Sequence, residues 1–107
     1  MKTLIIKLGA AGDVVRTTSL LRVLPGNVDW VTSDTNVALL DGVEELRACV
    51  PWSRVDGLEG RRYDLVINLE DSREAANLLN SIKFGDLFGA YLNGDGKLSY
   101  RRIGVTH

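Results

Sequence analysis

The residue of this 107-residue chain best suited to chemistry is Asp13, which closes the run Gly9-Ala10-Ala11-Gly12-Asp13. A carboxylate within about 2.6–3.2 Å of a hydroxyl oxygen can accept its proton and act as a general base. The two glycines let a ligand come close to the backbone, and free N–H groups at the start of a following helix favour an anion. The run therefore predicts a site for a phosphate or carboxylate group, with Asp13 as a candidate base for a sugar hydroxyl.

Structural roles can explain the same residues. Gly9 and Gly12 can serve only a tight turn from strand to helix, and Asp13 can be the N-cap of that helix. The common nucleotide motifs fit poorly, because the third glycine of G-x-G-x-x-G is missing and no Gly-Lys-Ser/Thr follows. Val15 also stands where a G-x-x-G-x-x-G variant needs its last glycine. A nucleotide-binding oxidoreductase domain therefore ranks below the other hypotheses.

The elements around this run alternate between strand and helix. Residues 3–8 form a nearly continuous apolar run typical of a buried parallel strand, and the spacing from Asp13 to Leu24 indicates a helix. Further strands are expected at residues 28–32, 63–69 and 86–92, and further helices at residues 36–40 and 71–82. Residues 97–101 are expected to form the second arm of a hairpin. The sequence therefore predicts an α/β fold with a Rossmann-like, mostly parallel sheet and flanking helices.

Two details of this pattern are less regular. Residues 44–62 show no clear periodicity, and we expect only a short strand near Val55 in this stretch. Asp71 and Glu74 have the spacing of a capping box, so Asp71 is expected to cap the helix that follows the strand at residues 63–69.

Composition excludes several classes of protein. With 13 Lys and Arg against 14 Asp and Glu, the formal net charge of -1 gives no general attraction to nucleic acid or anionic lipid. Cys49 is the single cysteine and His107 the single histidine, so neither a disulfide nor a zinc cluster is expected. No apolar run approaches the ~20 residues of a membrane span. We expect a cytoplasmic protein without a metal or cofactor, with at most peripheral contact at the inner face of the membrane.

Two segments of the chain carry a resemblance to a known family. The first is LIIKLGAAGDVVRTT at residues 4–18 with LLR at residues 20–22, and the second is YDLVINL at residues 63–69 with the Ser72-Arg73 pair that follows. They resemble the ADP-heptose:lipopolysaccharide heptosyltransferases, glycosyltransferase family 9. The strand Trp30-Val31-Thr32-Ser33 fits between them, so the resemblance covers essentially the whole chain.

The resemblance implies a two-lobed GT-B glycosyltransferase with its active site between the lobes. Residues 1–107 would be one incomplete acceptor-side domain, and the donor-binding C-terminal domain would be absent, because a chain of this length cannot hold two lobes. Asp13 would be the general base of an inverting, metal-independent transfer from an ADP-sugar to a lipopolysaccharide-core-type acceptor. We expect the chain alone to be inactive.

Further residues become candidates for substrate binding. Lys7 and the backbone of residues 9–12 would face a phosphate of the acceptor or donor, Arg16 and Thr17 would contact the acceptor, and Arg73 would bind an anionic sugar. Simpler explanations are a strand-end Lys7 that reaches water and a solvated helix face for Arg16 and Thr17. The alternative function is a non-catalytic Rossmann-like module for binding or assembly.

Overall fold

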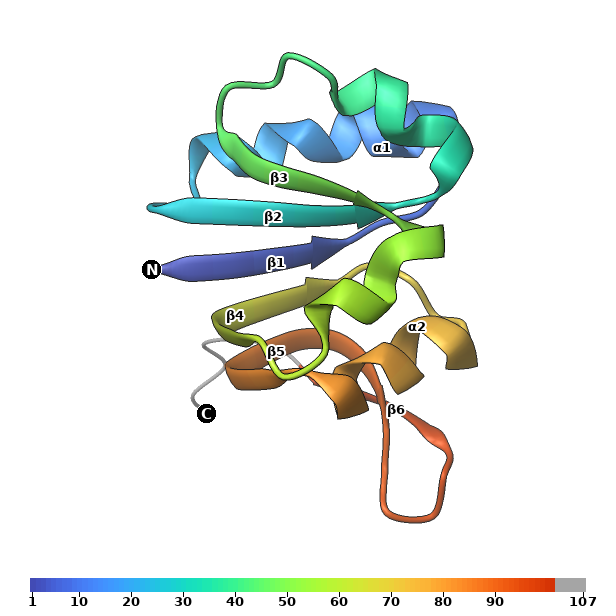
Figure 1. Cartoon of the computed structure of the whole chain (residues 1–107). Helices are drawn as coiled ribbons and strands as arrows, with labels where there is room; N and C mark the ends of the chain where they lie inside the picture. The colour runs from blue at the N-terminus through green and yellow to red at the C-terminus, as the bar shows by residue number, and fades with distance from the viewer. Residues whose placement is uncertain (102–107) are drawn as a thin grey trace.

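The computed structural model describes residues 1–101, which form a six-stranded sheet with short helices on both faces (Figure 1). The strands lie in the order β3-β2-β1-β4-β5-β6; the first five run parallel and β6 is antiparallel to β5. Their bounds are β1 (Lys2–Ile6), β2 (Asn27–Thr32), β3 (Leu46–Pro51), β4 (Arg62–Asn68), β5 (Lys83–Leu92) and β6 (Leu98–Arg101). The predicted α/β class and mostly parallel sheet are confirmed.

The helical elements are short and mostly of the 3-10 type. They are α1 (Ala11–Thr17), η1 (Thr18–Arg22), η2 (Asp34–Leu40), η3 (Trp52–Leu58), α2 (Arg73–Leu78) and η4 (Leu79–Ser81). Within residues 1–101, no helix combines the length and the apolar character needed to cross a membrane.

The helix expected from Asp13 to Leu24 is instead divided into α1 and η1. Thr17 Oγ1 donates to the backbone oxygen of Asp13 at 2.6 Å, and Thr18 Oγ1 donates to that of Val15 at 2.6 Å. Hydroxyl groups that bond to the carbonyls of the preceding turn compete with regular helical bonding. The two consecutive threonines therefore mark the place where the α-helix gives way to a 3-10 turn.

Both predicted aspartate caps are wrong. The N-cap of α1 is Ala10, in extended backbone, and no side chain caps this helix; Asp13 is its third residue. The N-cap of α2 is Ser72, whose hydroxyl accepts a hydrogen bond from the Ala75 N–H at 3.2 Å, so Asp71 lies one residue before the cap. Serine is as good an N-cap as aspartate, and the capping-box spacing of Asp71 and Glu74 gave no sign that the next residue takes this role.

The strand expected near Val55 is also wrong, because Val55 lies in η3 and the strand β3 precedes it. β3 is an edge strand of the sheet, and five of its six residues are half-buried. An edge strand lacks the continuous apolar run of a central parallel strand, which explains why its pattern was not recognised.

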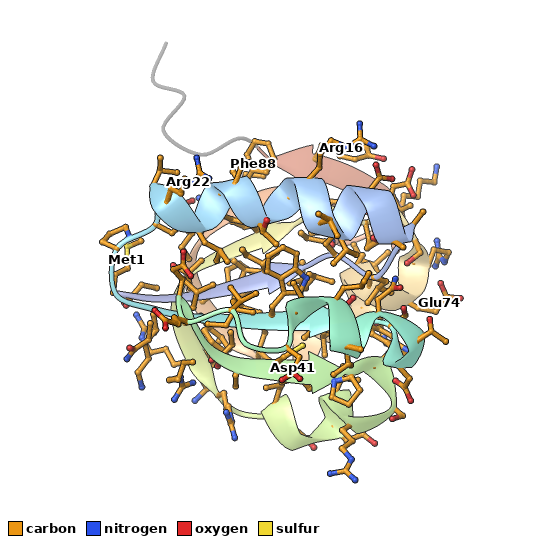
Figure 2. All side chains as sticks on the ribbon, turned by 90° about the horizontal axis from the view of Figure 1, so that it is seen from above. Met1, Arg16, Arg22, Asp41, Glu74 and Phe88 are labelled. Carbon is orange, nitrogen blue, oxygen red and sulfur yellow. The ribbon has the colours of Figure 1, made fainter. Side chains whose placement is uncertain are left out.

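Alternating side chains of the central strands fill two cores. Leu4 and Ile6 of β1 belong to the core under α2, η3 and η4, whereas Ile5 belongs to the core under α1, η1 and η2. Figure 2 shows α1 and η1 crossing one face of the molecule, with Arg16 and Arg22 turned outward. On the same side, Phe88 of β5 is 39% exposed.

A buried polar cluster joins β2, β3 and β4 within the sheet. The Asp29 side chain is 1% exposed and accepts hydrogen bonds from Arg47 Nε at 2.9 Å and from the Tyr63 hydroxyl at 2.7 Å. Burial, together with the hydrogen bond to Asp29, raises the pKa of Tyr63 to about 12. This cluster satisfies a carboxylate that would otherwise be costly to bury.

The pKa of Tyr63 predicts how the stability of the fold changes in alkaline solution. The pKa of Tyr63 in the folded protein lies above its usual value of 10.0. The contribution of Tyr63 to the free energy of unfolding is therefore complete below pH 10 and is lost as the pH rises towards 12. Between about pH 9 and 11.5, the free energy of unfolding should fall by about 2 kcal/mol more in the wild type than in Tyr63→Phe. Urea unfolding measures this difference. The exposed Tyr100→Phe is the control, and equal losses in wild type and Tyr63→Phe would contradict the assignment.

Candidate functional site

The parallel pairing of β1 with β4 brings two loops to one edge of the sheet. Ile6 is in register with Asn68, and the Leu69 N–H donates to the Ile6 carbonyl at 2.9 Å. Residues 7–10 connect β1 to α1 at this edge, and residues 69–72 connect β4 to α2. This is the edge where ligands bind in open parallel sheets.

Glu70 ties the ends of the two strands together. Its Oε2 accepts a hydrogen bond from the Leu8 N–H at 2.9 Å and lies 3.3 Å from the Lys7 ammonium nitrogen. The two charged side chains are only 16% and 18% exposed, for Lys7 and Glu70 respectively. Lys7 is therefore neither extended into water nor an unpaired cation; it balances a carboxylate that holds the backbone in place.

Side chains of β2 and η2 form hydrogen bonds to the backbone that follows β1, on the side opposite Glu70. The Leu8 carbonyl accepts hydrogen bonds from Asn36 Nδ2 at 2.8 Å and from Thr32 Oγ1 at 3.2 Å, and Trp30 Nε1 donates to the Lys7 carbonyl at 3.2 Å. Contacts from both neighbouring strands therefore fix the direction in which the chain leaves the sheet before Asp13.

A shallow hollow of about 490 Å³ lies at the start of α1. Four of the predicted site residues line it, together with one hydroxyl and one apolar side chain: Lys7, Asp13, Arg16, Thr17, Ser19 and Leu69. The Asp13 side chain is 51% exposed. The structure thus brings these four predicted residues together around an accessible carboxylate.

The Asp13 carboxylate has a single hydrogen-bond donor among the described residues. Arg16 Nη2 lies 3.1 Å from Asp13 Oδ1, and the Arg16 side chain is itself 81% exposed. Because Asp13 does not cap α1, its remaining lone pairs face the hollow and solvent. The Thr17 hydroxyl already donates to the Asp13 backbone, which leaves its oxygen free to accept.

A larger crevice of about 530 Å³ adjoins this hollow. Its lining combines charged, aromatic and small side chains from β4, β5 and β6 and from the segments that follow β1 and β4: Lys7, Asn68, Leu69, Glu70, Asp71, Phe88, Gly89, Ala90, Tyr100 and Arg101. Lys7 and Leu69 line both hollows, so the two are neighbours, and we refer to them together as the depression beside Asp13.

Gly89 shapes the floor of this crevice. Its φ of 114° is strained for any residue with a side chain, and a Cβ would collide with the Asn68 carbonyl oxygen. The Asn68 side chain, which is buried, donates to the Ala90 carbonyl at 2.8 Å and accepts from the Glu70 N–H at 3.0 Å. Asn68 therefore links the bend in β5 to the carboxylate that holds β1.

Unlike Gly89, Gly9 and Gly12 lie where the surrounding protein leaves room for a side chain. Neither has a positive φ. A Cβ on Gly12 would meet only Arg16 Nη2 at 3.9 Å, and one on Gly9 would meet Asn36 Nδ2 at 3.4 Å, both ordinary contacts. The absence of side chains at these two positions therefore leaves the backbone open to a ligand.

The structure does not bring Arg73 to this depression. Arg73 is the exposed first residue of α2 and lines neither hollow. The sequence analysis had not selected Phe88, Tyr100 and Arg101, which meet only because β6 pairs with β5. No three His, Cys, Asp or Glu side chains in residues 1–101 are grouped to hold a metal ion.

Comparison with known proteins gives structural matches alone; no family model and no curated protein matches the chain. The chain is similar to two solved structures of E. coli heptosyltransferase WaaC, one with ADP and one with ADP-2-deoxy-2-fluoro heptose. Each match covers 83% of this chain, with a TM-score of 0.65 and 20% sequence identity. The chain has a heptosyltransferase-like fold. It spans 36% of the length of each WaaC chain.

Substitution of Gly12 tests whether the turn or a ligand requires the glycine. Because Gly12 lies within α1 and has free space, Gly12→Ala should leave the free energy of unfolding unchanged or raise it by up to about 1 kcal/mol. Gly89→Ala, as the matched substitution at a crowded site, should lower it by about 2 kcal/mol or more. Urea unfolding gives both values. A loss of more than about 1 kcal/mol in Gly12→Ala would show that the turn needs glycine.

The role of Glu70 can be tested at a single amide. Glu70→Ala removes the acceptor of the Leu8 N–H, so hydrogen exchange at Leu8 should become about tenfold faster. The exposed Glu74→Ala on α2 is the matched control and should leave this rate unchanged. Unchanged exchange at Leu8 in Glu70→Ala would mean that the tie does not hold β1.

Proposed function

We propose that this chain is the acceptor-side lobe of a glycosyltransferase that moves heptose or a related sugar from an ADP-sugar to a lipopolysaccharide-core-type acceptor. The observation that carries the proposal is the exposed Asp13 carboxylate, which lines a depression at the carboxyl end of β1 in a heptosyltransferase-like fold. The matched WaaC structures contain ADP or an ADP-sugar analogue, which supports a nucleotide-sugar donor.

In the proposed reaction, an acceptor hydroxyl lies against Asp13. The carboxylate takes the hydroxyl proton while the hydroxyl oxygen attacks the anomeric carbon of the donor, and the bond from that carbon to the ADP oxygen breaks. One displacement from the opposite side inverts the anomeric configuration and releases ADP, with no metal ion required. Because a carboxylate is a weak base for an alcohol, most of the rate comes from orientation of the two reactants.

The other residues of the hollow position the reactants. Arg16, 3.1 Å from Asp13 Oδ1, orients the carboxylate, and the Thr17 oxygen accepts a hydrogen bond from the acceptor. Lys7 acts through Glu70 on the β1 exit, and Gly9 and Gly12 let the acceptor approach the backbone.

The donor is proposed to bind mainly to a second lobe, because the chain spans 36% of the WaaC chains whose fold it shares. A reaction that consumes an ADP-sugar belongs in the cytoplasm, and an acceptor of this type would place the enzyme at the inner face of the membrane, with peripheral contact only.

The 107-residue chain by itself should not transfer sugar. With an ADP-sugar and a glycan acceptor, ADP release by the purified chain should equal that of its Asp13→Asn variant, because the donor contacts of a second lobe are missing. Measurable glycoside formation, detected by mass spectrometry and abolished in Asp13→Asn, would contradict this division of roles.

In a protein that joins this lobe to a donor-binding lobe, Asp13→Asn should lower kcat by about 100-fold or more and change the acceptor KM little. The reason is that the amide keeps the shape of the side chain but cannot take the proton. Asp41→Asn, at an exposed position near η2, is the matched control and should retain full activity. Full activity in Asp13→Asn would contradict the role of Asp13 as the general base, whereas no transfer by the joined wild-type protein would favour the non-catalytic binding module.

A further inference from the structure

Two exposed aromatic rings line the crevice beside Asp13. Phe88 of β5 is 39% exposed and Tyr100 of β6 is 67% exposed, and they are the aromatic members of the exposed large apolar side chains in residues 1–101. Tyr100 is in register with Ala90, which is 1% exposed and also lines the crevice. Pockets for small molecules commonly combine such aromatic surface with a few polar groups.

The charged side chains that line the crevice are balanced, with Lys7 and Arg101 against Glu70 and Asp71. Lys7 pairs with Glu70 at 3.3 Å, and Arg101 pairs with Asp86 at 3.3 Å, while Asp71 adds a further carboxylate. Even if the exposed Arg101 pair opens, its carboxylate stays nearby. Each of the two cations that line the crevice therefore already has a carboxylate partner, which is unfavourable for an anionic ligand.

The neighbouring hollow does not change this balance. Its additional cation, Arg16, lies 3.1 Å from its additional carboxylate, Asp13. A phosphate placed in the depression would have to compete with a protein carboxylate for each of these cations. These ion pairs do not favour the phosphate or carboxylate site that the glycine run predicts.

The same groups suit a sugar that carries hydroxyls and no charge. The carboxylates of Glu70 and Asp71 accept hydrogen bonds from hydroxyl groups, and the Arg101 guanidinium donates to hydroxyl oxygens. One face of a pyranose ring presents C–H groups, which pack favourably on an aromatic ring and cover exposed apolar surface. The volumes of about 530 Å³ and 490 Å³ give room for two neighbouring sugars.

We propose that the crevice holds an uncharged pyranose of the acceptor glycan, packed on Phe88 and Tyr100, while the adjoining sugar presents its hydroxyl to Asp13. This inference rests on the proposed function and narrows its acceptor to a glycan that carries no phosphate or acid group at this position. Phe88 and Tyr100 select for the sugar ring, and the pairing of Lys7 and Arg101 with protein carboxylates selects against an anionic group.

Binding to the 107-residue chain tests the inference without any transfer reaction. The probes are methyl α-mannopyranoside and mannose 6-phosphate, each titrated to about 50 mM, and backbone amide NMR shifts report where they bind. The neutral glycoside should shift the amides of Leu69, Gly89 and Ala90 and bind at least about threefold more tightly than the phosphate ester. Phe88→Ala should weaken its binding about fivefold.

Control variants separate the crevice from the rest of the surface. Val23→Ala, at an apolar position that is 74% exposed and lines neither hollow, should bind like the wild type. Tyr100→Ala gives a second test at a more exposed position if Phe88→Ala does not fold.

Three outcomes would overturn the inference: tighter binding of mannose 6-phosphate, neutral-sugar shifts confined to another part of the chain, or no shift with either probe. None of these outcomes bears on the role of Asp13, which is tested separately by the kcat of Asp13→Asn. Conversely, no transfer by the joined wild-type protein would end the proposed function, and unchanged transfer in Asp13→Asn would overturn its general base, while shifts at Gly89 lost in Phe88→Ala would still establish a sugar-binding crevice.

Discussion

The Glu70 carboxylate is the contact on which the geometry of the site depends. It bridges the ends of two neighbouring parallel strands, because it bonds to the backbone after β1 from the loop that follows β4. The same carboxylate balances Lys7, which is mostly buried and would otherwise carry an uncompensated charge. Everything that leaves the sheet after Leu8, including Asp13, starts from a backbone position that this bridge and the Leu8 carbonyl bonds fix.

Sequence patterns predicted the fold to the extent that they reflect burial. The central strands β1 and β4 are apolar runs because both of their faces are covered, and both were found close to their expected bounds. The edge strand β3 has no such run and was missed. Both helix starts were misplaced, at Asp13 and at Asp71, because a cap depends on the backbone conformation of one residue and not on its type alone.

The candidate site also combines residues whose proximity the sequence predicts with residues that only the folding of the sheet brings together. Asp13, Arg16 and Thr17 are neighbours along one short helix, so their proximity followed from their spacing. Phe88 and Arg101 reach the crevice only through the pairing of β5 with β6, and the ion pairs that change its charge balance join residues far apart in the chain. The position of the carboxylate therefore follows from spacing along the chain, whereas the surroundings on which the ligand proposal rests depend on contacts between distant residues.

A structure of the chain with a bound acceptor disaccharide tests the central claim most directly. The account predicts one sugar hydroxyl within about 2.6–3.2 Å of the Asp13 carboxylate, with the next pyranose ring packed on Phe88. A disaccharide bound with no hydroxyl near Asp13, or bound in the separate hollow between η3 and α2 beside Trp52, would contradict it.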